Sequence, residues 1–313
     1  MHFRFMVAAS LLAFAVTTVA QMPDKPPTRP RITGISHIAV YASDPAATDH
    51  FYRDIVGAVK LPDPENPKGS RYALSATQFI EVLPLPEGAG ITRLDHTAWN
   101  TDDAEGLRRY LAARSWKTPP TVEKGADGSV WFTVKDPEGN KVEFVQPPAV
   151  LKPLAAPSVI GRHIIHVGFL VHSRVIEDTF YRDLLGFRPY WFGGMVEGKL
   201  DWVSQQAPDS HDWVEYMLTS GPSGSGIPPT MTQQNLGVLD HLSIGEASVP
   251  QAYKVLADGN RLTGRHDDQP KIGKDGKYQF NMYDPDGIRI ELMNFHASEK
   301  PCCSPFTADD PPE

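Results

Sequence analysis

The sequence predicts an α+β protein built from four similar units that are arranged in two pairs. Three observations lead to this prediction. The order strand, helix, strand, strand recurs along the chain, each half of the chain repeats short motifs of the other half, and a proline-rich stretch at 147–158 separates the halves. Recurrence of motifs in a fixed order indicates an internally repeated architecture. The 313 residues, 41% hydrophobic and 22% charged, are enough for two medium-sized domains.

The beginning of the chain predicts export. Residues 1–20 combine a cationic start at Arg4, an apolar stretch and a small-residue ending, which is the layout of a secretory signal peptide. We therefore expect a periplasmic or secreted protein with no stable membrane association after cleavage, and an uncleaved N-terminal anchor is the alternative. Residues 21–31 are rich in proline and predict an extended linker.

The charge of the chain argues against nucleic acid as a partner. The net charge is −8, and removal of residues 1–20 takes away Arg4 and no acid, which gives −8 − 1 = −9. An acidic protein binds a phosphate backbone poorly, so a small-molecule substrate is the expected partner. Because all four units lie in one chain, a monomer is plausible and a dimer is possible.

The only cysteines, Cys302 and Cys303, are adjacent in a tail at 298–313 that is expected to be irregular. The chain therefore has no disulfide framework. The pair could bind a metal or close a ring, but we expect no catalytic role for it.

In the first half, residues 32–148, a β-rich run at 32–44 ends at an Asp-Pro helix start. Phe51, Ile55 and Val56 follow at helical spacing, and Gly57 ends this helix. The elements expected after it are strands within 71–85, a strand at 93–103, an amphipathic helix at 104–116 and a hairpin at 130–146.

The second half, residues 161–297, follows a linker at 149–160 and repeats this order. Its first helix ends at Gly186, as the first helix of the chain ends at Gly57. The expected elements are a strand at 163–173, a helix at 175–187, strands at 200–206 and 211–220, a loop at 219–229, a strand at 238–246, a helix at 249–260 and a hairpin at 278–294.

Specific motifs place the two halves in register. Phe51-Tyr52-Arg53-Asp54 recurs at 180–183, and a histidine precedes each copy by 14 residues. Asp136-Pro137-Glu138-Gly139 and Asp284-Pro285-Asp286-Gly287 each lead to a glutamate seven residues after the aspartate. Leu94-Asp95-His96 recurs as Leu239-Asp240-His241.

Each unit begins its first strand with a histidine and ends its last strand with a glutamate in an apolar run. A single such residue usually has a structural role, but the same pair at equivalent places in four units indicates metal ligands. Two imidazoles and two carboxylates suit a borderline divalent cation, which would also compensate the buried acids. The candidate ligands are His37, Glu81, His96 and Glu143 in the first half, and His166, Glu215, His241 and Glu291 in the second.

This pattern resembles the vicinal oxygen chelate superfamily, which includes glyoxalase I, extradiol dioxygenases and bleomycin resistance proteins. The resemblance covers residues 31–296. It implies four βαβββ units that form two paired modules, with curled mixed sheets around a metal cavity, and it implies the same eight residues as ligands.

The resemblance favours a glyoxalase-like isomerase or lyase that acts on a small oxygenated substrate. Nickel, zinc, cobalt or manganese would bind two adjacent substrate oxygens and stabilise an enediolate. Glu143 and Glu291 are the expected catalytic bases. Glu81 and Glu215 are expected as metal ligands that could share the proton transfer. An exported protein meets little glutathione, so a glutathione adduct is a doubtful substrate.

The first alternative is an iron(II) extradiol dioxygenase that uses His166, His241 and Glu291. Glu215 as an extra ligand argues against it, as does Asn281 where such enzymes usually carry a tyrosine. An aromatic-rich insertion at 189–202 could line a pocket for a ring, or it could pack its own Trp191, Phe192 and Trp202. The second alternative is a binding or resistance protein without catalysis, against which two full ligand sets argue.

Overall fold

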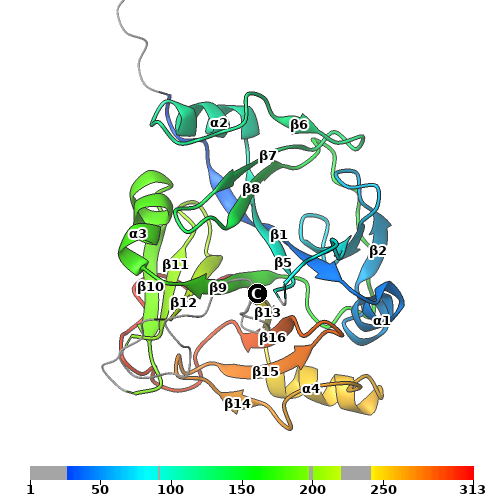
Figure 1. Cartoon of the computed structure of the whole chain (residues 1–313). Coiled ribbons are helices and arrows are strands. Elements are labelled where there is room, and N and C mark those ends of the chain that lie inside the picture. The colour runs from blue at the N-terminus through cyan, green and yellow to red at the C-terminus, as the bar shows by residue number, and fades with distance from the viewer. Residues whose placement is uncertain (1–26, 91, 197–199, 220–240) are drawn as a thin grey trace, which may run out of the picture.

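The computed structural model describes residues 27–90, 92–196, 200–219 and 241–313. The expected signal peptide at 1–20, most of the loop at 219–229, and Leu239 and Asp240 lie outside these ranges. The described residues form two sheets of eight strands each, one from each half of the chain (Figure 1). We refer to the halves as module 1 (32–148) and module 2 (161–297), with bounds that remain predictions. No helix in the described part of the chain is long and apolar enough to cross a membrane.

Each module contains two βαβββ units. Helices α1 (Pro45–His50) and α3 (Arg174–Asp178) continue as π-helical turns, η1 (Phe51–Ile55) and η2 (Thr179–Leu184), while α2 is Ala104–Ala112 and α4 is Val249–Asp258. The strands of module 1 are β1 (Ile32–Ala42), β2 (Val59–Pro62), β3 (Ser70–Ala73), β4 (Phe79–Pro84), β5 (Leu94–Thr101), β6 (Glu123–Lys124), β7 (Val130–Lys135) and β8 (Lys141–Gln146). Those of module 2 are β9 (Ile164–Val171), β10 (Arg188–Gly193), β11 (Trp202–Gln206), β12 (Trp213–Leu218), β13 (His241–Glu246), β14 (Lys271–Ile272), β15 (Tyr278–Tyr283) and β16 (Arg289–Asn294).

The two sheets have the same mixed topology. Module 1 has the order β2-β3-β4-β1-β5-β8-β7-β6, and module 2 repeats it as β10-β11-β12-β9-β13-β16-β15-β14. At the centre of the first sheet, β1 runs parallel to β4 and antiparallel to β5, and β5 runs parallel to β8. The predicted α+β class, with paired modules of curled mixed sheets, is confirmed. The first and last strands of each unit therefore meet at the centre of a sheet.

The repeated helix starts and stops have local causes. The Asp44 carboxylate caps α1 by accepting from the backbone N–H groups of Ala46 and Ala47, and Pro45 stands at its first turn. Gly57 and Gly186 both have positive φ, +80° and +84°, which glycine adopts without steric cost. The predicted ends of both helices are thus confirmed.

The Asp-Pro-acid-Gly turns connect the two modules. The carboxylate of Glu138 in module 1 accepts from the backbone N–H groups of His172 and Ser173, just before α3 of module 2. In the reverse direction, the Asp286 carboxylate of module 2 accepts from the N–H of Ser43, just before α1, at 2.8 Å. Each module therefore holds the start of a helix of the other.

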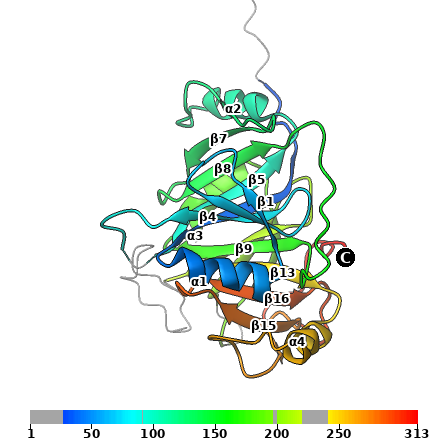
Figure 2. The ribbon, with the colours of Figure 1, turned by 90° about the vertical axis from the view of Figure 1, so that its right-hand side faces the viewer.

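The Phe-Tyr-Arg-Asp motif takes part in the same junction. Tyr52 is fully buried and donates from its hydroxyl to Asp284 Oδ2 at 3.0 Å, and α1 lies beside the second sheet (Figure 2). Trp116 of module 1 stacks on Phe180 of η2, with ring centroids 4.8 Å apart. One hydrophobic core contains buried side chains from both modules. The motifs that established the repeat therefore belong to the interface between the modules.

The C-terminal residues 298–313 form neither helix nor strand but pack against module 2. The Phe306 ring lies 4.9 Å from that of Tyr190, and the Thr307 N–H donates to the Tyr190 carbonyl at 2.9 Å. Cys302 and Cys303 are joined by a disulfide. In Figure 1 the chain ends beside β9 and β13.

A buried lysine anchors this tail. The ammonium of Lys277 donates to Asp310 Oδ1 at 2.7 Å, to the Phe295 carbonyl at 2.6 Å and to the Tyr190 hydroxyl at 3.0 Å. Lys277 is fully buried, and Trp213 and Phe306 present their rings to its charge at 5.4 and 5.0 Å.

The aromatic insertion at 189–202 is a hairpin of β10 and β11. Trp191 is buried in a small cluster with Tyr190, Trp213 and Met293, and Trp202 packs against that cluster. Phe192 is exposed. The tryptophans of the insertion therefore pack mainly within module 2 itself.

Candidate metal centres

In module 1 the four predicted ligands converge from β1, β4, β5 and β8. His37 Nε2 and His96 Nε2 are 3.0 Å apart. Glu81 Oε2 lies 3.8 Å from the first nitrogen and 3.6 Å from the second. Glu143 Oε1 lies 3.7 and 3.9 Å from the same two nitrogens. All four side chains are buried. Their mutual distances show that two imidazoles and two carboxylates face one point.

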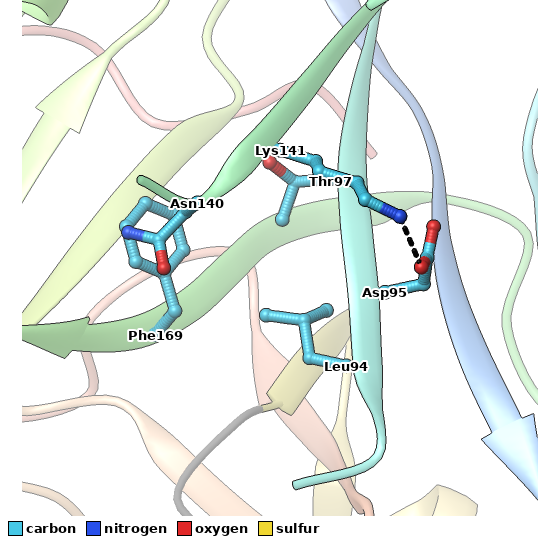
Figure 3. Close-up of a pocket in the computed structure, with 6 residues that line it drawn as sticks. All are labelled: Leu94, Asp95, Thr97, Asn140, Lys141 and Phe169. Carbon is cyan, nitrogen blue, oxygen red and sulfur yellow. Dashed lines mark hydrogen bonds and ion pairs between the residues drawn. The ribbon is translucent and has the colours of Figure 1, made fainter. Parts of the chain in front are cut away.

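The histidines of module 1 are oriented by neighbours in the sequence. Asp95 Oδ2 lies 2.8 Å from His96 Nδ1, and Ser36 Oγ lies 3.1 Å from His37 Nδ1. Asp95 also accepts from the ammonium of Lys141 at 2.7 Å, as Figure 3 shows. These bonds leave each Nε2 free to face the centre, which is the usual arrangement of metal-binding histidines. The aspartate of the Leu-Asp-His motif is therefore a positioning residue in module 1.

The electrostatics of Asp95 support this role. Burial raises its pKa, but the hydrogen bond with His96 and the ion pair with Lys141 outweigh burial, and the pKa stays well below its ordinary value. Asp95 is therefore ionised at neutral pH. An ionised carboxylate at Nδ1 fixes the tautomer of His96 and makes Nε2 a better electron donor.

The carboxylates of the module 1 site lack a hydrogen-bond partner for one oxygen each. Glu81 Oε2 and Glu143 Oε1 are buried without a hydrogen bond. Burial and the neighbouring Asp63 raise the pKa of Glu81 to about 11, and burial also raises the pKa of Glu143. Burial lowers the pKa of His37, which keeps its imidazole neutral. A divalent cation would compensate both acids and needs neutral imidazoles, so these residues fit a metal ion.

Module 2 brings its four predicted ligands together in the same way. His166 Nε2 and His241 Nε2 are 3.0 Å apart, Glu291 Oε2 lies 3.2 Å from the former, and Glu215 Oε2 lies 3.5 Å from the latter. Gly168 faces this centre, because a Cβ there would lie 2.0 Å from His241 Cε1. Burial raises the pKa of Glu291, but the hydrogen bond with His166 and the charge of Arg289 lower it to about 2.

The position of Asn281 bears on the dioxygenase alternative. Asn281 pairs with Glu291 across β15 and β16, and its amide donates to Asp267 Oδ2 at 2.7 Å. At the position where dioxygenases usually carry a tyrosine, module 2 therefore has an amide that is bound to Asp267 beside the candidate metal centre.

The sequence prediction missed three charged residues at the module 1 site. Glu65 lies in the loop between β2 and β3, and one of its carboxyl oxygens belongs to a group with ligand atoms of His37 and Glu143 that all lie within 4.8 Å of one another. Arg71 pairs with Glu65 and, at 3.2 Å, with Asp63. Glu65 lies in a loop outside the repeated motifs, so no periodic pattern in the sequence pointed to it.

A cavity of about 410 Å³ lies beside the module 1 site. Residues two apart on a strand share a face, so Leu83 and Lys141 lie on the faces that carry Glu81 and Glu143. The cavity also includes Asp95, which binds His96. The other residues of its wall are Tyr41, Asn66, Lys68 and Pro84–Pro86. None of the four candidate ligands belongs to this wall, and Asp95 connects the cavity to the site through its contact with His96.

Comparison with known families agrees with this geometry. The family model of the Glyoxalase/Bleomycin resistance protein/Dioxygenase superfamily matches residues 34–144 and 179–292. The chain belongs to this superfamily, and the resemblance to the vicinal oxygen chelate proteins is confirmed. No curated protein sequence matches the chain closely enough to count as a relative.

Solved structures with the same fold include dioxygenases and a glyoxalase. A catechol 2,3-dioxygenase is 17% identical with a TM-score of 0.61, covering 90% of this chain and 96% of its own. The Mn(II)-bound glyoxalase from Novosphingobium aromaticivorans is 18% identical with a TM-score of 0.61, covering 85% and 83%. The E323L variant of homoprotocatechuate 2,3-dioxygenase from Brevibacterium fuscum is 16% identical with a TM-score of 0.64, covering 92% and 76%. At these identities the likeness shows the fold alone.

Proposed function

We propose that this protein is an exported, metal-dependent enzyme of glyoxalase type, an isomerase or lyase that acts on a small molecule with two adjacent oxygens. The observation that carries the proposal is the matched set of two histidines and two glutamates facing one point in each module. Three-ligand iron sites of dioxygenases need no second carboxylate. The layout of residues 1–20 supports export, and the four units of one chain support a monomer.

The roles of the residues follow from their contacts. The cation, when bound, would act as a Lewis acid on the substrate oxygens and stabilise the negative charge that forms on proton loss. Glu143 would take the proton in module 1, while the Thr133 hydroxyl holds its other oxygen at 3.3 Å. Glu81 would remain a ligand. Glu291 and Glu215 would have the corresponding roles in module 2.

Module 1 is the better candidate for turnover in the described part of the chain. Its cavity places a substrate beside Asp95 and Lys141, where the ammonium of Lys141 is half exposed and can contact an anionic or hydroxyl group. The tail and the aromatic cluster cover part of module 2. We therefore expect loss of the module 1 site to remove most activity.

The test is metal content of the purified full chain, by elemental analysis, beside His96→Ala and His241→Ala variants. We expect one ion of nickel, zinc, cobalt or manganese per module, each variant losing the ion of its own module. Iron that is lost only in His241→Ala would support the dioxygenase instead. A chain that takes up no metal on reconstitution would leave the binding protein as the remaining function.

Activity is tested by deuterium exchange. The metal-loaded chain in D2O should exchange the carbon-bound proton next to the carbonyl of small α-hydroxyketones, as followed by NMR, and Glu143→Gln should slow this exchange about a hundredfold or more. Exchange that is unchanged in the variant would remove Glu143 from the base role.

A further inference from the structure

Glu65 is a carboxylate of the module 1 centre that is carried by a loop. It lies in the loop that joins β2 to β3, its side chain is 6% exposed, and an oxygen of it lies in the group formed with His37 and Glu143. The four predicted ligands sit on the central strands β1, β4, β5 and β8, whose ladder hydrogen bonds fix their positions. A loop residue is free of that constraint.

Arg71 holds the loop over the site. Its guanidinium pairs with Glu65 and Asp63 and lies over the ring of Phe79 at 4.2 Å. Phe79 in turn stacks on the imidazole of His37, with ring centroids 4.3 Å apart. The Arg71 guanidinium therefore ties the loop to the metal-facing side of the sheet. Its ion pair with Asp63 can hold Arg71 in place without Glu65.

The same loop borders the cavity. Asn66 and Lys68, which follow Glu65, form part of the cavity wall together with Leu83 and Lys141. The segment that carries Glu65 therefore takes part in both the charged cluster of the centre and the wall of the cavity.

We propose that Glu65 is a fifth metal donor of module 1 and the donor that the substrate displaces. Divalent cations of this group take up to about six donors, and a substrate that binds through two oxygens needs two of these places. With five protein donors in place, one has to leave, and Glu65 is the only one on a loop. This inference rests on the proposed metal-binding function.

The first experiment measures Mn(II) binding to the full metal-free chain by calorimetry, with Glu65→Ala and Glu65→Gln variants. The matched control is Glu87→Ala, an exposed acid on a neighbouring loop. We expect both Glu65 variants to weaken Mn(II) binding at one site about tenfold or more, with the control like wild type. Glu65→Gln keeps the size of the side chain and serves if Glu65→Ala lowers the melting temperature.

The second experiment adds probes to the Mn(II)-loaded proteins. Oxalate, which binds through two oxygens, should bind the Glu65 variants about tenfold more tightly than wild type, while acetate should bind all of them alike. Unchanged Mn(II) binding in both variants, or weaker oxalate binding, would overturn the role of Glu65 and leave the proposed function intact. A wild-type chain that binds no Mn(II) or other divalent metal would overturn both.

Discussion

Removal of the Asp310 carboxylate should destabilise module 2 through a lysine that lies 33 residues earlier in the chain. Lys277 is fully buried, and Asp310 is the acid that its ammonium contacts, at 2.7 Å. Breaking a buried ion pair by deleting one partner costs about 3–5 kcal/mol. A second estimate gives the upper limit of this loss of unfolding free energy. A lysine can escape the penalty by losing its proton, which costs about 4.6 kcal/mol at pH 7 for an ordinary pKa of about 10.4. We therefore expect Asp310→Ala to lower the free energy of unfolding by about 3–4 kcal/mol at pH 7.

The pH dependence of this loss has a definite sign. Burial lowers the pKa of Lys277 in the folded chain, and loss of Asp310 lowers it further. The folded variant then binds fewer protons than the unfolded chain, so its deficit is largest at neutral pH and shrinks as the pH approaches about 10. Lys277→Met together with Asp310→Ala removes the buried charge and should recover most of the loss.

The assay is urea unfolding of wild type, the single variant and the double variant at pH 7 and 9.5, with the slope and the midpoint both fitted. A loss below about 1 kcal/mol at pH 7 would contradict the account of Lys277, as would a loss that is equal at both pH values.

Two further predictions concern the metal site and the module junction. Asp95→Asn should weaken Mn(II) binding at module 1 about ten- to a hundredfold, because His96 loses the anion that orients it, and calorimetry showing wild-type affinity would contradict this. Glu177 on α3 accepts from the backbone N–H of Glu138 in module 1 at 3.1 Å. Burial raises the pKa of Glu177 to about 9, so the folded state favours its neutral form, and the stability present below about pH 4 is lost as the pH rises through 9. Glu177→Gln should therefore have the unfolding free energy of wild type near pH 4 and exceed it at pH 8 by on the order of 3 kcal/mol. Denaturation curves that give the same difference in unfolding free energy at every pH would refute this prediction.

The eight candidate ligands could be proposed from the sequence because the repeat placed them at equivalent positions on strands. A histidine at the head of a strand says little alone, but His37, His96, His166 and His241 head the first strand of four units, and those strands pair at the centres of the two sheets. The pairing of parallel and antiparallel neighbours then brings four side chains to one point.

The edges of the sheets were harder to predict. Strands β2, β6 and β14 are short and mostly exposed, so their sequences carry no alternation of apolar and polar residues. The predicted helix at 104–116 ends earlier, at Ala112, and Ser115 has a positive φ of 63°. In each module, about half of the first helix is a π-helical turn. The spacing of apolar residues alone does not distinguish such a turn from an α-helix.

Contacts between distant segments were beyond the sequence patterns. The repeat showed that Tyr52 is equivalent to Tyr181, but it gave no reason to expect its hydroxyl at Asp284 of the other module. Glu65 and Asp310 lie in segments without periodicity, and their partners depend on how loops cross the sheets. Lys277 has the appearance of a solvent-exposed hairpin lysine until the tail is placed over it.

The exchange of helix contacts between the modules has a consequence for the order in which the chain can fold as it is made. Tyr52 is synthesised early, but its partner Asp284 lies 232 residues later. Until module 2 has left the ribosome, the Tyr52 hydroxyl lacks its acceptor Asp284, and the Ile55 carbonyl lacks Arg261, which donates to it in the finished protein. Contacts at this sequence separation form slowly. The growing chain therefore passes through a long interval in which module 1 is complete in length and still incompletely folded, and it is in that interval that protection from aggregation is most needed.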